Sequence, residues 1–205
     1  MVRSAGGIGD GMQLTVGQFT QATALAGNDL ATFPDFPAEI RAPVGTTFGV
    51  SSFQINFGAN RIMTSGDDFD VLVAMNPAAL KVEMSRLKKG GLLILDTGTF
   101  NERNLIKAGF DGNPLEDHTV DAFNVVPLDI SGMTQEAVKE VDVSKKEALR
   151  CKNKWALGFV YWPFARTRKS TEDWLQVKFA SKPDIAVAHI AGRNAGHAMA
   201  ETAEM

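Results

Sequence analysis

The sequence is poor in cysteine, in excess charge of either sign and in long apolar runs. Its 205 residues include a single cysteine, Cys151, so the chain cannot form an internal disulfide or a cysteine-ligated zinc or iron–sulfur site by itself. The formal net charge is −3, with no basic excess of the kind that nucleic-acid binding requires. No run of about 18 apolar residues is present, and the start lacks a signal-peptide pattern. We therefore expect a cytoplasmic protein that binds neither nucleic acid nor membranes.

Residues that usually carry catalysis or bind metals are also few. His118 falls in a polar stretch, and His189 and His197 are two turns apart on one expected helix, too far to share a metal. Cys151 falls at an apolar position with helical spacing, which predicts a buried, inert thiol. The sequence therefore predicts no catalytic group and no metal site in this chain.

The middle of the chain predicts a βαβ unit. Phe69–Ala74 is an apolar run short enough for a buried strand. Asn76 and Pro77 follow it as a helix N-cap and first helical residue. The apolar spacing extends the helix to Lys88–Lys89, with Gly90–Gly91 as its stop, and Leu92–Asp96 as the next strand.

The remaining pattern completes an α/β fold. Strands are expected at 30–33, broken by Pro34, at 49–57 and at 122–127, where the proline should lie at a strand end or sheet edge. Helices are expected at 12–26, 101–108, 134–141 and 145–161, after a cap at Ser170, and from Pro183 onward. We predict a Rossmann-like, mostly parallel sheet of about four or five strands with helices on both faces. One domain should span 1–205, with the sheet core at 1–130 and a helical C-terminal portion at 131–205.

Glycines near the start form a candidate phosphate site. Gly7, Gly9 and Gly11 lie between a short apolar start and an expected helix. Glycine lets a ligand approach the backbone, and the first turn of a helix attracts anions. A tight turn that only serves chain geometry has the same pattern. The spacing falls short of G-x-G-x-x-G and no acidic strand end is clear, so a nicotinamide site is disfavoured.

Two further places could serve the same anion. Glu39 and Arg41 lie between prolines, either as a loop-anchoring ion pair or with Arg41 as a clamp for a phosphate or carboxylate. Asn76 follows a parallel strand, where open α/β sheets place their ligands. The pattern by itself describes an anion-binding or interaction module.

Several segments of the sequence together carry a family resemblance: 33–41, 70–79, 89–96, 152–162, 171–175, 194–198 and 201–204. They resemble the gamma domain of the 2-oxoacid:ferredoxin oxidoreductases, and especially the N-terminal part of the 2-oxoglutarate:ferredoxin oxidoreductase alpha subunit. The first segment is similar to the family's "PEIRGG"-type loop and the second to its "DVLVALNPEAL" strand–helix junction. The resemblance covers essentially all 205 residues in order.

The resemblance implies a gamma-type domain in an enzyme that converts 2-oxoglutarate to succinyl-CoA and reduces ferredoxin. Thiamine diphosphate, Mg and iron–sulfur clusters would lie on partner domains or chains, and the isolated chain would not be catalytic. The gamma domain would contribute coenzyme A handling and subunit packing. Gly7, Gly9 and Gly11 would admit the phosphates of coenzyme A, and Arg41, next to Glu39, would add a charged contact. The alternative is a purely structural module, with no ligand of its own, in an oxidoreductase for pyruvate or a branched-chain 2-oxoacid.

Overall fold

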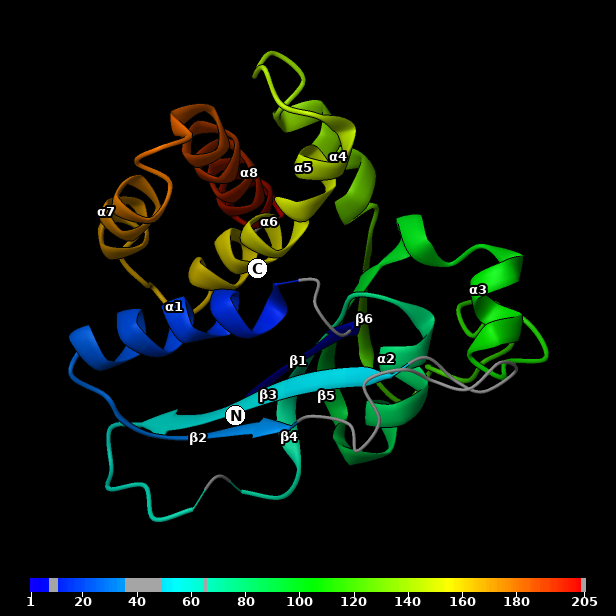
Figure 1. The fold of residues 1–205 in the computed structure, drawn as a ribbon. Helices are drawn as coiled ribbons and strands as arrows, with labels where there is room; N and C mark the ends of the chain where they lie inside the picture. Colours follow the sequence, from blue (N-terminus) through cyan, green and yellow to red (C-terminus); the bar gives the residue numbers. More distant parts are fainter. Residues whose placement is uncertain (8–10, 36–48, 65, 204–205) are drawn as a thin grey trace. The chain divides into compact units, whose positions relative to one another are not determined.

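The protein is described by a computed structural model that covers residues 1–7, 11–35, 49–64 and 66–203. Two compact units can be distinguished (Figure 1). The sheet unit comprises Met1–Gln13 and Asp29–Asp129, and the helical unit comprises Leu14–Asn28 and Ile130–Met205. The change of unit after Asp129 coincides with the predicted end of the sheet core, whereas the first helix groups with the C-terminal helices. The single domain over 1–205 stays a prediction.

The sheet unit holds six strands and two short α-helices in its described part. The strands are β1 (Val2–Gly7), β2 (Asp29–Asp35), β3 (Val50–Gly58), β4 (Phe69–Ala74), β5 (Leu87–Asp96) and β6 (Asn124–Leu128). The helices are α2 (Pro77–Glu83) and α3 (Glu102–Lys107), together with the single 3₁₀ turns η1 (Met84–Arg86) and η2 (Thr97–Thr99).

The strands form one sheet in the order β2-β3-β1-β4-β5-β6. Strand β3 runs antiparallel to both neighbours, β1 and β2. The pairs β1–β4, β4–β5 and β5–β6 are parallel. The predicted α/β fold with a mostly parallel sheet is confirmed, with one strand more than the upper expectation.

The centre of the sheet is buried on both faces, as the apolar runs predicted. Adjacent residues of β4, Leu72 and Val73, point to opposite faces and are both buried. The core on one face joins Leu72 and Leu93 to Leu80 of α2 and Leu105 of α3. This packing holds the helix that follows β4 against the sheet and so fixes where the loop after β4 lies.

Two prolines found in strands, Pro34 and Pro127, both lie on edge strands of the sheet, where a missing backbone N–H is tolerated. The expected break at Pro34 is wrong, because β2 continues to Asp35 with Pro34 opposite Phe53. Strand β2 lies at one edge of the sheet, where a residue without an N–H costs no central hydrogen bond. Pro127 lies in β6 at the other edge, as expected.

The predicted helix end at Lys88–Gly91 is wrong, because this segment belongs to a strand. Helix α2 stops at Glu83, tightens into η1, and β5 already begins at Leu87. Along β4, the pairing partner jumps from Leu87 opposite Phe69 to Leu92 opposite Val71, which makes a bulge. The two glycines serve this bulge: Gly90 has φ +72°, and its N–H donates to Ala122 O at 2.8 Å.

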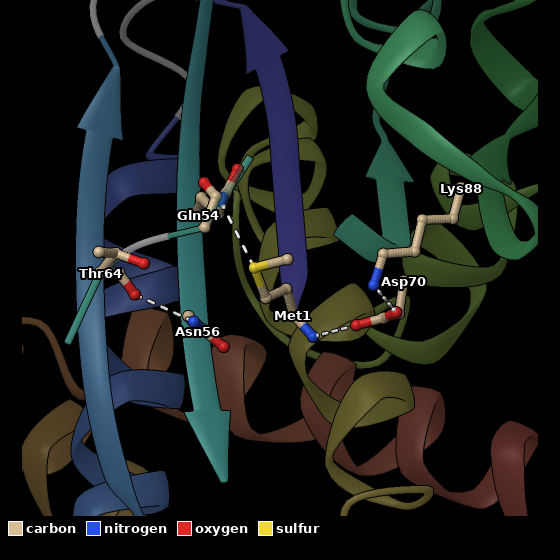
Figure 2. A network of polar contacts seen from close by, with 7 residues as sticks. Met1, Gln54, Asn56, Thr64, Asp70 and Lys88 are labelled. Atoms are coloured by element: carbon tan, nitrogen blue, oxygen red, sulfur yellow. Dashed lines mark hydrogen bonds and ion pairs between the residues drawn. The ribbon is translucent and has the colours of Figure 1, made fainter. Parts of the chain in front are cut away.

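Asp70 stabilises the bulge from the β4 side. Figure 2 shows its carboxylate between the Lys88 ammonium and the Met1 amino group, and the Lys88 Nζ–Asp70 Oδ1 distance is 2.7 Å. Partial burial acts in the opposite direction, but the hydrogen bonds from Lys88 and the amino group hold the pKa of Asp70 below its ordinary value. The ion pair is half exposed, so it adds little stability and mainly defines the register.

A buried ion pair links β1 to α2. Arg3 donates from Nη2 to Glu83 Oε1 at 2.7 Å and from Nη1 to Gln54 Oε1 of β3 at 3.2 Å. Arg3 is 1% exposed and Glu83 is 3% exposed. Charges buried this deeply are tolerated only when paired, so the contact joins two strands and a helix.

The helical unit contains most of the first helix and five later ones. Helix α1 (Met12–Leu25) begins in the sheet unit and continues here; the others are α4 (Ile130–Ala137), α5 (Lys145–Arg150), α6 (Lys152–Tyr161), α7 (Lys169–Lys178) and α8 (Pro183–Thr202). The predicted start at Pro183 is confirmed, and Gly27 ends α1 with φ +77°. None of the helices in the described ranges is long and apolar enough to cross a membrane.

Three helix predictions in this unit need correction. The expected 145–161 helix is interrupted at Cys151, whose carbonyl accepts from Lys154 N and Trp155 N as α6 begins. Helix α4 starts at Ile130 rather than 134, because the buried Ile130 and Thr134 lie on its inner face. Ser170 lies within the first turn of α7 and does not cap it.

Helices α6 and α8 approach at backbone distance. A Cβ added to Gly158 would lie 1.9 Å from Arg193 O, and one added to Gly196 would lie 1.9 Å from Trp155 O. Each glycine therefore faces the main chain of the other helix. Trp155, on α6, is buried and stacks on Phe159 with ring centroids 5.7 Å apart.

Candidate functional site

The ends of three parallel strands bring candidate groups to one edge of the sheet unit. Strand β1 ends at Gly7, β4 at Ala74 and β5 at Asp96. Ala5 pairs with Ala74, and Ala74 pairs with Leu95, so the residues that follow these strands start side by side. Ligands of open α/β sheets bind at such carboxyl ends.

Gly7 and Gly11 lie on either side of residues 8–10, between this edge and α1. Gly7 is the last residue of β1, opposite Val50 of β3. Gly11 has φ +89°, a left-handed conformation that other residues rarely adopt, directly before α1 begins at Met12. Gln13 Nε2 donates to Ser52 O at 3.0 Å and ties the first turn of α1 to β3. Among the predicted glycines, Gly11 is therefore required for its backbone conformation.

Asn76 follows β4 at the same edge and caps α2. Its side-chain oxygen accepts from Ala79 N at 2.8 Å, and Pro77 follows at the first helical position, as predicted. Because this oxygen already serves the cap, the amide nitrogen is the part that could donate to a ligand. Asn76 therefore has a structural role that a binding role would have to share.

Thr99 and Asn104 extend the edge beyond β5, and the sequence prediction missed both. Thr99 Oγ1 donates to Asp96 O at 2.8 Å and to Met75 O at 3.3 Å, which connects the ends of β4 and β5. Asn104 Nδ2 donates to Thr99 O at 2.9 Å. The sequence signal for Thr99 and Asn104 is their position just after the Leu92–Asp96 run, which was predicted to be a strand.

The other predicted residues fall outside the described ranges. Gly9, Glu39 and Arg41 are among them, so the structure brings together Gly7, Gly11 and Asn76 and leaves the proposed clamp a prediction. Within the described residues, no group of three or more His, Cys, Asp or Glu side chains could hold a metal ion.

The environment of Cys151 does not favour a nucleophilic thiolate. It is 1% exposed, and burial, followed by the negative charge of Glu147, raises the pKa of its thiol to about 12. The thiolate, which is the reactive form, is therefore suppressed at neutral pH. The predicted burial of Cys151 is confirmed, and its lack of reactivity stays a prediction.

Comparison with protein families assigns the chain to a known group. The family model for pyruvate ferredoxin/flavodoxin oxidoreductases matches residues 1–199. The chain belongs to this family. The resemblance to 2-oxoacid:ferredoxin oxidoreductases inferred from the sequence is therefore confirmed.

Individual members of the pyruvate ferredoxin/flavodoxin oxidoreductase family match the whole chain. The 2-oxoglutarate oxidoreductase subunit KorA of Mycobacterium tuberculosis is 47% identical over 204 residues, which cover 100% of this chain. The chain spans only 31% of the length of that relative. The 2-oxoglutarate:ferredoxin oxidoreductase from Magnetococcus marinus, solved with 2-oxoglutarate, coenzyme A and succinyl-CoA bound, matches with a TM-score of 0.74 and 25% identity. That match covers 98% of this chain and 31% of the Magnetococcus chain.

Two further solved structures share the fold along nearly their full length. The keto/oxoacid ferredoxin oxidoreductase gamma subunit from Geobacter sulfurreducens has a TM-score of 0.64 at 15% identity, with 98% of both chains covered. The pyruvate oxidoreductase subunit PORC from Thermotoga maritima has a TM-score of 0.61 at 17% identity, covering 96% of this chain and 94% of that chain. The same fold thus exists both as a separate subunit and as about a third of a longer chain.

Proposed function

We propose that this chain is the gamma-type domain of a 2-oxoglutarate:ferredoxin oxidoreductase, in which 2-oxoglutarate is oxidatively decarboxylated to succinyl-CoA and ferredoxin is reduced. The observation that carries the proposal is the 47% identity to the KorA subunit over the whole chain. The similarity to the pyruvate subunit, at 17% identity, supports the shared fold alone. The 2-oxoglutarate substrate is therefore favoured over pyruvate or a branched-chain 2-oxoacid.

The proposed role of the domain is to bind coenzyme A and to pack against the thiamine-binding parts of the enzyme. A structural relative was solved with coenzyme A bound, and this chain has Gly7 at the carboxyl end of β1 and Gly11 directly before α1. Coenzyme A ends in a phosphate-rich nucleotide, which suits backbone amides, the Asn76 amide nitrogen and the guanidinium of Arg41. Thiamine diphosphate, Mg and the iron–sulfur clusters would be held by partner domains, since a cluster of the usual kind needs several cysteines and this chain has one.

The substrate is tested with the assembled oxidoreductase. We expect 2-oxoglutarate to support ferredoxin reduction that depends on coenzyme A, and pyruvate to support far less. The isolated chain should show no turnover with either acid. A complex that prefers pyruvate would reject the assignment, and turnover by the isolated chain would reject the division of labour among domains.

The ligand role is tested by calorimetry with coenzyme A on the same complex. Replacement of Arg41 by alanine removes one charge-assisted contact and should weaken coenzyme A binding about tenfold, or on the order of 1–3 kcal/mol. Arg103→Ala is the matched control, because Arg103 is an exposed arginine on α3. Equal affinities for the two variants would favour the purely structural module.

A second pair of variants tests the edge at Asn76. Asn76→Asp keeps an oxygen that can cap α2 but places a negative charge where coenzyme A phosphates are proposed. Asn101→Asp is the control, because Asn101 Oδ1 caps α3 in the same way, accepting from Asn104 N at 3.0 Å. Only Asn76→Asp should weaken binding, by roughly tenfold. If both variants bind coenzyme A like the wild type, the ligand lies elsewhere.

A further inference from the structure

The helical unit contains a buried lysine without an acidic partner. Lys154, on α6, is 4% exposed, and its Nζ donates to Thr15 Oγ1 of α1 at 3.1 Å. The same nitrogen lies 5.2 Å from the centroid of the Trp174 ring on α7. Among the residues that the structure describes, no carboxylate forms an ion pair with Lys154. Buried lysines without such a partner are rare, since burial opposes the charged form.

The charged groups that face Lys154 are mostly cations. Lys178 of α7 lies with its Nζ 4.5 Å from the same Trp174 ring. Arg193 and His189 approach from α8, and Arg193 is already engaged with Glu172 of α7 at 3.5 Å. The part of α1 in this unit, Leu14–Leu25, has no charged residue.

The acidic residues on the remaining neighbours of α6 are turned to other partners. Glu147 of α5 bonds to Ser144 in a capping box, and Glu136 of α4 pairs with Lys139. The groups around Lys154 thus add positive charge, and none of the acidic residues named here compensates for the charge of Lys154 itself.

Burial lowers the pKa of two members of this cluster, Lys154 and His189. Burial, then Lys178, then Arg193, lowers the pKa of Lys154 from 10.5 to about 7. Burial, together with Lys154 and Lys178, lowers the pKa of His189 to about 4, so His189 is already neutral at pH 7. The Trp174 ring favours a cation beside it, but Lys178 occupies the same ring at the shorter distance.

We propose that Lys154 is a proton-operated link that joins α6 to α1 and α7. As an uncharged amine it keeps its hydrogen bond to Thr15 and packs beside Trp174. When it takes up a proton, a further buried positive charge faces Lys178 and Arg193, and the contacts of α6 with α1 and α7 weaken. The inference is independent of the proposed function.

The titration of Lys154 can be followed directly in the full chain. With ¹³C-labelled lysine, the Cε resonances report each side chain by NMR as the pH is raised. We expect one lysine resonance to titrate near pH 7 and to be missing in Lys154→Met. Lys178→Met should move the Lys154 midpoint upward, because it removes a cation that opposes protonation. Lys169→Met, on the same helix but paired with Asp173, should leave the midpoint unchanged.

The link also has a signature in unfolding. Because folding lowers the pKa of Lys154, the unfolded chain binds one proton more than the folded chain above pH 7, so the urea midpoint should rise with pH from 7 to about 9. Above pH 9 the raised pKa of Cys151 acts in the opposite direction. Lys154→Met should abolish this rise.

Three results would overturn the inference. The first two are the absence of a lysine that titrates below about pH 9 and an unchanged pH dependence in Lys154→Met. A Lys154 midpoint that climbs when inorganic phosphate is added would also overturn it, because the cluster would then be an anion site. Since Lys178→Met changes only an exposed side chain, its midpoint shift tests the inference even if Lys154→Met fails to fold.

Discussion

The close approach of α6 and α8 makes a sharp prediction at Gly158. A Cβ at this position would lie 1.9 Å from Arg193 O and 2.8 Å from the carbonyl carbon. Ordinary contacts begin at 3.4 Å, so the two helix backbones would have to separate by about 1.5 Å. Neither neighbour is the flexible end of a side chain, so the strain cannot be relieved locally.

The cost follows from two opposing effects. Overpacking of a well-packed interior costs about 1–3 kcal/mol, and a backbone clash belongs at the upper end of that range. Alanine recovers up to about 1 kcal/mol relative to glycine in a helix interior. Gly158→Ala should therefore lower the free energy of unfolding of the helical unit by about 2 kcal/mol. Gly196→Ala, which meets Trp155 O in the same way, should behave alike.

Gly17→Ala is the matched control. Gly17 lies inside α1 of the same unit, and an added Cβ meets nothing within 4 Å. This variant should gain about 0.5–1 kcal/mol from helix propensity alone. Gly158→Ala should thus lower the free energy of unfolding, and Gly17→Ala should raise it.

Tryptophan fluorescence during urea unfolding is a suitable assay. All three tryptophans of the chain, Trp155, Trp162 and Trp174, lie in the helical unit, so fluorescence reports this unit selectively. If Gly158→Ala and Gly17→Ala both raise the urea midpoint, the helices do not meet at Gly158 as described. The reasoning about α6 and α8 would then be refuted.

Three further predictions concern buried polar groups. Arg3→Met leaves Glu83 buried without its cation and should lower the free energy of unfolding, measured by circular dichroism, by about 3–5 kcal/mol. The double variant Arg3→Met/Glu83→Met should recover most of that loss. Equal stabilities of the single and double variants would contradict the pairing. Cys151 should react with a thiol reagent only at the unfolding rate, and a fast reaction in native buffer would show an accessible thiolate. Folding lowers the pKa of His189 to about 4, so stability should fall as the pH drops from 6.5 to 4; His189→Leu should flatten this acid limb, and an unchanged slope would count against the burial.

The sequence predicted those elements whose signals are local. The run Phe69–Ala74 became β4 with the expected ends, and Asn76 caps α2. Both follow from short-range chemistry: a buried apolar strand and a side chain that accepts from the third helical N–H. The left-handed Gly27 ends α1 for the same kind of reason.

The sequence failed where distant contacts decided the local structure. Lys88–Gly91 has the composition of a helix end, but pairing with β4 and the Ala122 carbonyl draws it into a bulged strand. Thr99 also gains its role only when β4 and β5 lie side by side. Lys154 has the helical spacing of an ordinary surface lysine, and only packing against α1 and α7 makes it a buried one.

We propose that coenzyme A phosphates bind beside Gly11, directly before α1, and the two glycines that flank this helix test the proposal most directly. Gly11, with φ +89°, precedes α1, and Gly27, with φ +77°, follows it, so alanine imposes a similar backbone strain at either end. In the assembled oxidoreductase we predict that Gly11→Ala weakens coenzyme A binding by on the order of tenfold or more, while Gly27→Ala binds like the wild type. Equal dissociation constants for the two variants, measured by calorimetry, would contradict the account.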